Sequence, residues 1–239
     1  MDQRKNRIVD YRIGAGASGR SLCRRATRLL IDFLKQVEPQ LNAQLLKCYL
    51  REISGMSTSL MFTPTSIAGA FLIDPILRHD GRGHFSRAWC TSEFSEQGLN
   101  FVPVQANTGF SFKKGTLRGL HFQAEPALEG KLVRCTRGVL FDVVADLRPN
   151  SPSYCKWYGV ELKADQYQML YVPEGCAHGY QTLEDNTDLF YMTSQYFTPS
   201  AARGMRYDDP AFGIKWPLVP TMISEQDRNW PLFDETSPS

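Results

Sequence analysis

Hydrophobic positions follow two different periods along the chain, and the change falls near residue 56. From Ser18 to Gly55 apolar residues recur at three- and four-residue spacings, which is typical of an amphipathic helix. The stripe contains Leu22, Ala26, Leu29, Leu30, Phe33, Leu34 and Val37, and it continues through Leu41, Leu45, Leu46, Tyr49, Leu50 and Ile53. Pro39 interrupts the segment, so the pattern predicts a helical hairpin or a bent helix.

Beyond Met56 the pattern becomes one of short apolar runs separated by Gly, Pro, Asn and Asp, which is typical of strands joined by turns. The two-residue alternation is clearest over 139–146, where Asp142 and Asp146 share one side with Leu140 and Val144. Many short strands predict a mainly β fold, an antiparallel sandwich or jelly roll. The chain therefore divides into a helical extension, 1–55, and a β domain, 56–239.

The extension is basic, with 11 Lys and Arg residues against 5 Asp and Glu over 1–55. Its charges are spread over several turns without aromatic residues between them, so neither nucleic acid nor a membrane is expected as a partner. Because Met56 directly precedes the β domain and could itself start translation, we interpret 1–55 as a dispensable extension. The alternative is a helix that docks on the β domain or on a partner through its apolar stripe.

The composition is ordinary for a globular protein, with 42% hydrophobic and 22% charged residues. No apolar run approaches the length that crosses a bilayer, and the N-terminal residues lack a charged-then-apolar signal pattern. The six cysteines show neither a C-x-x-C pair nor a regular spacing. These features predict reduced thiols and a cytoplasmic location.

Candidate chemistry lies in four of the strand-like runs. His121 lies in "GTLRGLHFQ", Lys131 opens "KLVRCTRG", His178 lies in "PEGCAHGY" and Tyr191 lies in "DLFYMTSQYF". Alternate residues of neighbouring strands point into the same interior, so these side chains are expected on one wall of a barrel. A base, a cation and a phenol together are the parts of a proton abstraction next to a carbonyl.

A metal site of the cupin type is the alternative for these histidines, and the sequence disfavours it. Such sites use an H-x-H pair, but position +2 from His121 is Gln123, and the remaining His79 and His84 lie in a turn-like stretch. A metal is therefore not expected. Arg82 and Arg118 are candidates for binding an anion such as a diphosphate, against the alternative of surface arginines in turns.

At these motifs the chain resembles the dTDP-4-dehydrorhamnose 3,5-epimerase family of sugar-nucleotide epimerases. The resemblance covers about residues 58–234 and is carried by "DGRGHFSRAW", "GTLRGLHFQ", "GKLVRCTRGVLFDVVADLR", "SPSYCKWYGVEL", "YVPEGCAHGYQTL" and "ISEQD". It implies a cupin-like jelly-roll barrel, a homodimer, and neither a metal nor an organic cofactor. It also implies C3 and C5 epimerisation of a dTDP-linked 4-keto-6-deoxy-hexose, the step from dTDP-4-dehydro-6-deoxyglucose to dTDP-4-dehydrorhamnose in dTDP-rhamnose biosynthesis.

The resemblance also implies roles for particular residues. His121 resembles the base, Asp227 its carboxylate partner, Lys131 the cation that stabilises the enolate, and Tyr191 the acid that returns a proton from the opposite face. The substrate-binding residues that it implies are Arg82, Phe85, Arg118, Gln123 and His178.

Two stretches depart from the family pattern: Thr108-Gly109 before the base, and Tyr196-Phe197 in place of a tyrosine pair. Three alternatives therefore stay open: an epimerase acting at C3 only or at C5 only, a sugar-nucleotide-binding cupin without activity, and a metal-dependent cupin.

Overall fold

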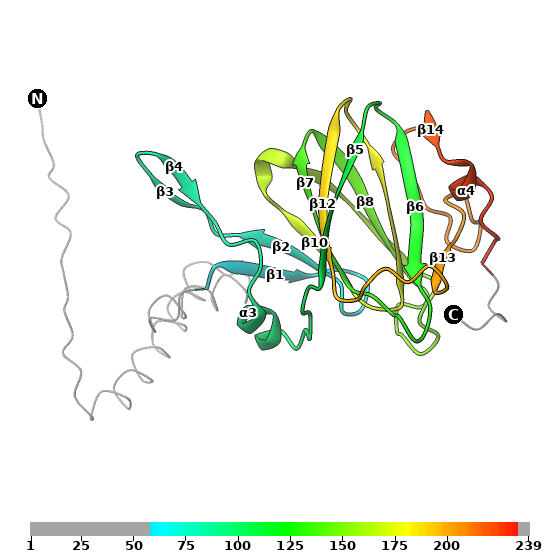
Figure 1. Cartoon of the computed structure of the whole chain (residues 1–239), viewed down its shortest axis with the longest axis horizontal. Helices are drawn as coiled ribbons and strands as arrows, with labels where there is room; N and C mark the ends of the chain where they lie inside the picture. The colour runs from blue at the N-terminus through cyan, green and yellow to red at the C-terminus, as the bar shows by residue number, and fades with distance from the viewer. Residues whose placement is uncertain (1–57, 234–239) are drawn as a thin grey trace, which may run out of the picture. The chain divides into compact units, whose positions relative to one another are not determined.

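The computed structural model describes residues 58–233, and Figure 1 shows the order of their elements. The predicted helical extension, 1–55, and its dispensability lie outside the described residues. Within them, no helix is long and apolar enough to cross a membrane.

Six antiparallel strands form the first sheet. In order across the sheet they are β1 (Leu60–Pro64), β2 (Phe71–Pro75), β10 (Met169–Val172), β7 (Lys131–Arg137), β12 (Thr187–Thr193) and β5 (Gln105–Ser111). β5 and β1 are the edges of this sheet, and the long-range pairing of β7 with β12 lies near its centre.

The second sheet is also antiparallel, apart from one short parallel strand. Its order is β13 (Ala202–Gly204), β6 (Thr116–Gln123), β11 (Cys176–Thr182), β8 (Val139–Asp146) and β9 (Trp157–Lys163), and β14 (Met222–Ile223) pairs with β6 in parallel. The other elements are the hairpin β3 (Arg78–Asp80) and β4 (Gly83–Phe85), two short helices, α3 (Thr91–Glu96) and α4 (Glu225–Arg228), and the 3₁₀ turn η1 (Ala164–Gln166). The described part is thus mainly antiparallel β, as the sequence predicts.

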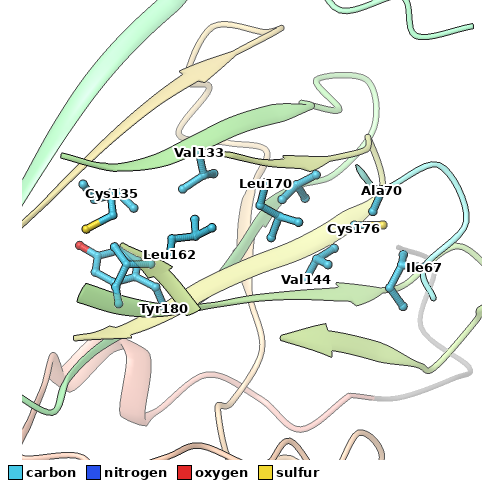
Figure 2. Close-up of a cluster of buried hydrophobic side chains, with 12 residues drawn as sticks. Ile67, Ala70, Val133, Cys135, Val144, Leu162, Leu170, Cys176 and Tyr180 are labelled. Carbon is cyan, nitrogen blue, oxygen red and sulfur yellow. The ribbon is translucent and has the colours of Figure 1, made fainter. Parts of the chain in front are cut away.

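The main core lies between the two sheets, because one cluster of buried side chains draws on both of them. Val133 and Leu170 come from the first sheet, and Val144, Leu162 and Tyr180 come from the second (Figure 2). Each such side chain contributes about 1.5–3 kcal/mol when it is removed from water. This shared cluster defines the inner face of each sheet.

The outer face of the second sheet is covered as well, which explains why β8 is apolar on both sides. Val143 and Ala145 alternate with the inward Val144, and they pack with Met205 and Phe212 from the segment after β13. The predicted alternation over 139–146 is therefore correct, but both of its sides are buried.

Candidate active site

The two histidines of the predicted set are direct partners across β6 and β11. In the antiparallel register His178 lies opposite His121, so both imidazoles leave the sheet on the same side. His178 also lies opposite Val144, which belongs to the core between the sheets. Both rings therefore face the first sheet.

The lysine and the tyrosine occupy the facing side of the first sheet. Tyr191 of β12 lies opposite the core residue Val133 of β7, and Lys131 lies two positions before Val133. Side chains two residues apart on a strand share a face. The Lys131 Nζ donates a hydrogen bond to the carbonyl oxygen of His121 at 3.2 Å, which joins the two sheets. Strand alternation thus turns the four residues toward the space between the sheets, but they lie on two facing sheets and not on one wall as expected, because β6 and β11 belong to one sheet and β7 and β12 to the other.

Asp227, the carboxylate implied by the resemblance, contacts the base candidate directly. Its Oδ1 lies 2.6 Å from Nε2 of His121, and its Oδ2 accepts from the backbone N–H of Gly119 at 3.2 Å. The side chain of Asp227 is 6% exposed, whereas that of His121 is 46% exposed. The aspartate is therefore fixed inside the protein and the imidazole is accessible to a ligand.

Several contacts hold Asp227 in place and keep it ionised. It lies in α4, where Ser224 Oγ accepts from its backbone N–H at 3.0 Å, and the indole N–H of Trp230 donates to its Oδ1 at 3.2 Å. Burial works to raise the pKa of Asp227, but the hydrogen bond and charge of His121 and the other donors together lower it below its usual value. An ionised Asp227 fixes the orientation of the imidazole.

Lys131 has a partner that the sequence reasoning missed. Its Nζ lies 2.9 Å from Oε1 of Glu129, and the two side chains are only 8% and 11% exposed. The second carboxylate oxygen, Oε2, accepts from Nε2 of Gln123 at 3.4 Å. Glu129 lies in the loop before β7, where no strand alternation could have predicted its direction.

Tyr191 is half-buried against the core, and its surroundings favour the protonated phenol. Burial raises the pKa of Tyr191 above its usual value, and the negative charge of Glu129 adds to that rise. The phenol therefore stays protonated at neutral pH.

His178 belongs to a second histidine–aspartate pair, and both of its side chains are buried. Its Nε2 lies 2.7 Å from Oδ1 of Asp142, while Asp142 Oδ2 has no hydrogen-bond partner among the described residues. Asp142 was also missed, although the alternation over 139–146 had placed it, with Asp146, beside inward apolar residues. The pair makes His178 a fixed polar group in the wall of the site.

Arg118 bridges the second sheet to the edge strand of the first. Its guanidinium donates to the carbonyl oxygen of Phe110 at 3.1 Å and to Ser111 Oγ at 3.4 Å. Tyr180 lies opposite Arg118, and a Cβ added to Gly109 would lie 3.2 Å from the Tyr180 hydroxyl. The Thr108-Gly109 departure therefore leaves room for a buried phenol that the sequence reasoning did not single out.

Gln123 lies beside these residues, but its amide is engaged by the protein. Its Oε1 accepts from the N–H of Thr198 at 2.6 Å, and its Nε2 donates to the carbonyl oxygens of Ala127 and Tyr196 at 3.0 and 3.1 Å. These bonds tie together the loops at one end of the site.

Arg82 and Phe85 do not join this group within one chain. They lie in the β3–β4 hairpin, which extends away from the two sheets (Figure 1). The Arg82 side chain is 91% exposed and paired with Asp80 at 2.6 Å, and Phe85 is 69% exposed. Both residues are thus free to meet a ligand or another molecule.

As to metal ligands, residues 58–233 contain no group of three or more His, Cys, Asp and Glu side chains that could hold an ion. Among the described residues, Cys90, Cys135, Cys155 and Cys176 are not joined in disulfides.

Gly204 leaves room for the Trp230 indole that donates to Asp227, so a substitution at Gly204 tests this contact. Gly204 lies opposite His121, and an added Cβ would come within 2.2 Å of the Trp230 ring. Gly204→Ala should displace the indole and lower the free energy of unfolding by about 1–3 kcal/mol, measured by chemical denaturation. Gly81→Ala, where a Cβ meets nothing within 4 Å, is the matched control. Equal stability of the two variants would contradict the argument.

Comparison with known proteins agrees with this geometry. The family model described as dTDP-4-dehydrorhamnose 3,5-epimerase matches residues 64–235. A protein of that name from Sinorhizobium fredii is 43% identical over 177 residues, which cover 74% of this chain and 91% of the relative. The crystal structure of dTDP-4-dehydrorhamnose 3,5-epimerase from Elizabethkingia anophelis superposes with a TM-score of 0.72 at 33% identity, covering 74% of this chain and 97% of that one.

A third similar protein has a narrower activity in its name. ChmJ, a 3'-monoepimerase from Streptomyces bikiniensis solved in complex with dTDP-quinovose, superposes with a TM-score of 0.66 at 31% identity, covering 71% of this chain and 86% of that one. The family model spans most of the chain, and the relatives are matched over nearly their whole length. The chain therefore belongs to the dTDP-4-dehydrorhamnose 3,5-epimerase family.

Proposed function

We propose that this protein epimerises C3 and C5 of a dTDP-linked 4-keto-6-deoxy-hexose, converting dTDP-4-dehydro-6-deoxyglucose to dTDP-4-dehydrorhamnose. One observation carries the proposal: the accessible imidazole of His121, held by a buried aspartate, faces a buried lysine and a protonated tyrosine across the interior. Both C3 and C5 flank the C4 ketone, so one base and one cation can serve both centres.

The proposed steps follow from where these groups lie. His121 removes the proton next to the ketone, and Asp227 supports the resulting imidazolium. The electrons move to the ketone oxygen, where the Lys131 ammonium stabilises the enolate. Tyr191 comes from the facing sheet, so it is placed to return a proton on the side opposite to His121. Delivery from the opposite side inverts the carbon.

Binding is proposed to use groups around this centre. Arg118 bridges β6 and β5 and offers a guanidinium to the diphosphate. His178 is proposed as a fixed contact in the wall, and Gln123 as a residue that shapes the binding loops. Because Arg82 and Phe85 project from their own chain, their proposed substrate contacts require a homodimer in which the hairpin of one copy reaches the site of the other.

We also propose that the two sheets form a cupin-like jelly-roll barrel that needs no cofactor. The shared core and the inward-facing residues of both sheets support the barrel. The cytoplasmic location stays a prediction from the thiols and the composition.

An epimerase that acts at a single centre is the second candidate, and the position of the Tyr180 hydroxyl beside Gly109, where a Cβ would be crowded, favours it. The phenol of Tyr180 changes the shape of the site near Tyr191. In addition, the similar protein ChmJ is named a monoepimerase. A non-catalytic binding protein is disfavoured, because binding alone requires no such set of proton-transfer groups.

Proton NMR in D₂O with dTDP-4-keto-6-deoxyglucose tests the proposal. Deuterium should enter at both C3 and C5, and both centres should invert. Exchange and inversion confined to one centre would establish the single-centre alternative. Absence of exchange at both carbons, with dTDP still bound, would overturn the proposed activity in favour of a binding protein.

Replacement of Tyr191 by phenylalanine should separate proton removal from proton return. Tyr191→Phe keeps the ring in the core and removes the donor, so deuterium should still enter while inversion falls by about 10²-fold at one or both centres. NMR of the product configuration measures both processes. An equal loss of exchange and inversion would point to a purely structural role of the tyrosine.

A further inference from the structure

Glu129 is a buried carboxylate inside the candidate site, and none of the proposed steps uses it. It touches the proposed cation through Oε1, at 2.9 Å from Lys131 Nζ, and it touches Gln123 through Oε2. Gln123 is itself held by Ala127, Tyr196 and Thr198. The carboxylate is therefore anchored on one side and paired with the lysine on the other.

The ammonium of Lys131 needs such a partner because it is almost entirely removed from water. A buried charge without a counter-ion is strongly unfavourable, and a lysine responds by moving or by losing its proton. Either response would remove the cation from the enolate. The ion pair with Glu129 opposes both.

The geometry also leaves the lysine one free donor. An ammonium has three N–H groups. One is directed to Glu129 at 2.9 Å and one to the carbonyl oxygen of His121 at 3.2 Å. The two acceptors thus fix Nζ beside the backbone of the base residue, and the third N–H remains for an oxygen of the ligand.

We propose that Glu129 is a positioning residue of this enzyme, which holds the Lys131 ammonium in place and directs it at the ketone oxygen of the sugar. The inference rests on the proposed function of Lys131 and adds a residue to it. Glu129 acts through the lysine and does not itself exchange a proton with the sugar.

The same carboxylate influences the proton donor. Its negative charge contributes, after burial, to the raised pKa of Tyr191. The other ionisable groups facing this interior are the His121–Asp227 pair, the His178–Asp142 pair, Tyr180 and Arg118. Burial and then the charge of Glu129 raise the pKa of Tyr191, and Tyr191 in turn contributes to the raised pKa of Tyr180. Removing the charge should therefore let Tyr191 lose its proton at lower pH.

Glu129→Gln tests the proposal, because the amide keeps the size of the side chain and removes its charge. The exchange rate at C3 and C5 should fall about 10- to 100-fold, as for other partners that orient a functional group, with dTDP affinity changed less than about threefold. The alkaline limb of the pH–rate profile should move to lower pH. Glu161→Gln, which removes an exposed carboxylate on β9, is the matched control and should match the wild type in both respects.

A double-mutant cycle with Lys131→Met separates positioning from general damage. If Glu129 acts through the lysine, Glu129→Gln should slow exchange much less in the Lys131→Met background than in the wild type. The same fold loss in both backgrounds, or wild-type exchange in Glu129→Gln, would overturn the inference. Loss of thermal midpoint in each single variant, with recovery in the double variant, would support the buried pair without any substrate.

Glu129→Asp, which shortens the side chain, is the second test and serves if Glu129→Gln does not fold. Glu129→Asp keeps the charge but draws it away from Nζ, so exchange should fall while the alkaline limb moves less than in the amide variant. Wild-type exchange in Glu129→Asp would overturn the positioning role. Failure of the proposed function is a different result: the wild type itself would show no exchange.

Discussion

Replacing His121 by asparagine should lower proton exchange at both C3 and C5 by about 10²–10⁴-fold, the usual loss when a general base is removed. The amide can still accept or donate a hydrogen bond toward Asp227, so the wall of the site should keep its shape. It cannot take up a proton at neutral pH. Deuterium entry followed by NMR measures the loss at each carbon separately, and a single base predicts that both rates fall together.

Binding and stability distinguish this result from misfolding. Calorimetry with dTDP should give an affinity within about threefold of the wild type, because the diphosphate is proposed to contact Arg118 and the hairpin instead. Glu161→Gln, which changes an exposed side chain on β9, is the control and should keep wild-type exchange. Wild-type exchange in His121→Asn would remove the base assignment. Loss at one carbon only would mean that a second base serves the other centre.

The strands and their inward residues could be predicted from the sequence because both depend on a local two-residue period. That period places Lys131 with Val133, and it places Asp142 with Val144. It does not tell which strand neighbours which. The pairing of β6 with β11, which sets His178 opposite His121, joins segments that lie far apart in the chain.

The partners of the site residues were harder to predict, because loops supply most of them. Asp227 was found through the family motif alone, since it lies in a four-residue helix near the end of the described chain. Glu129 and Trp230 follow no periodic pattern in the sequence. The need for glycine at position 204 could not be predicted either, because it depends on the indole of Trp230 that packs against it. The position of Arg82 and Phe85 away from the site could not be read from their motif either.

Lys131→Met should reduce exchange at C3 and C5 by about 10²–10³-fold, the loss seen when one donor to a developing oxyanion is removed. Methionine keeps most of the side-chain length and fills the space, so the change tests the charge of the lysine and not its volume. The exchange rate should fall equally at both centres, because each enolate places its negative charge on the same ketone oxygen. Deuterium entry again gives the rate, and dTDP binding should change little.

Lys131→Met also leaves the buried carboxylate of Glu129 without its partner, and this affects the stability of the variant. An unpaired buried charge costs stability by itself, so part of any loss could come from a displaced loop. Lys131→Met/Glu129→Gln removes both charges and should recover the thermal midpoint without recovering exchange. Lys163→Met, at a partly exposed position on β9, controls for the loss of a positive charge on the protein. Exchange restored in the double variant would mean that the lysine serves to neutralise Glu129, and that another group stabilises the enolate.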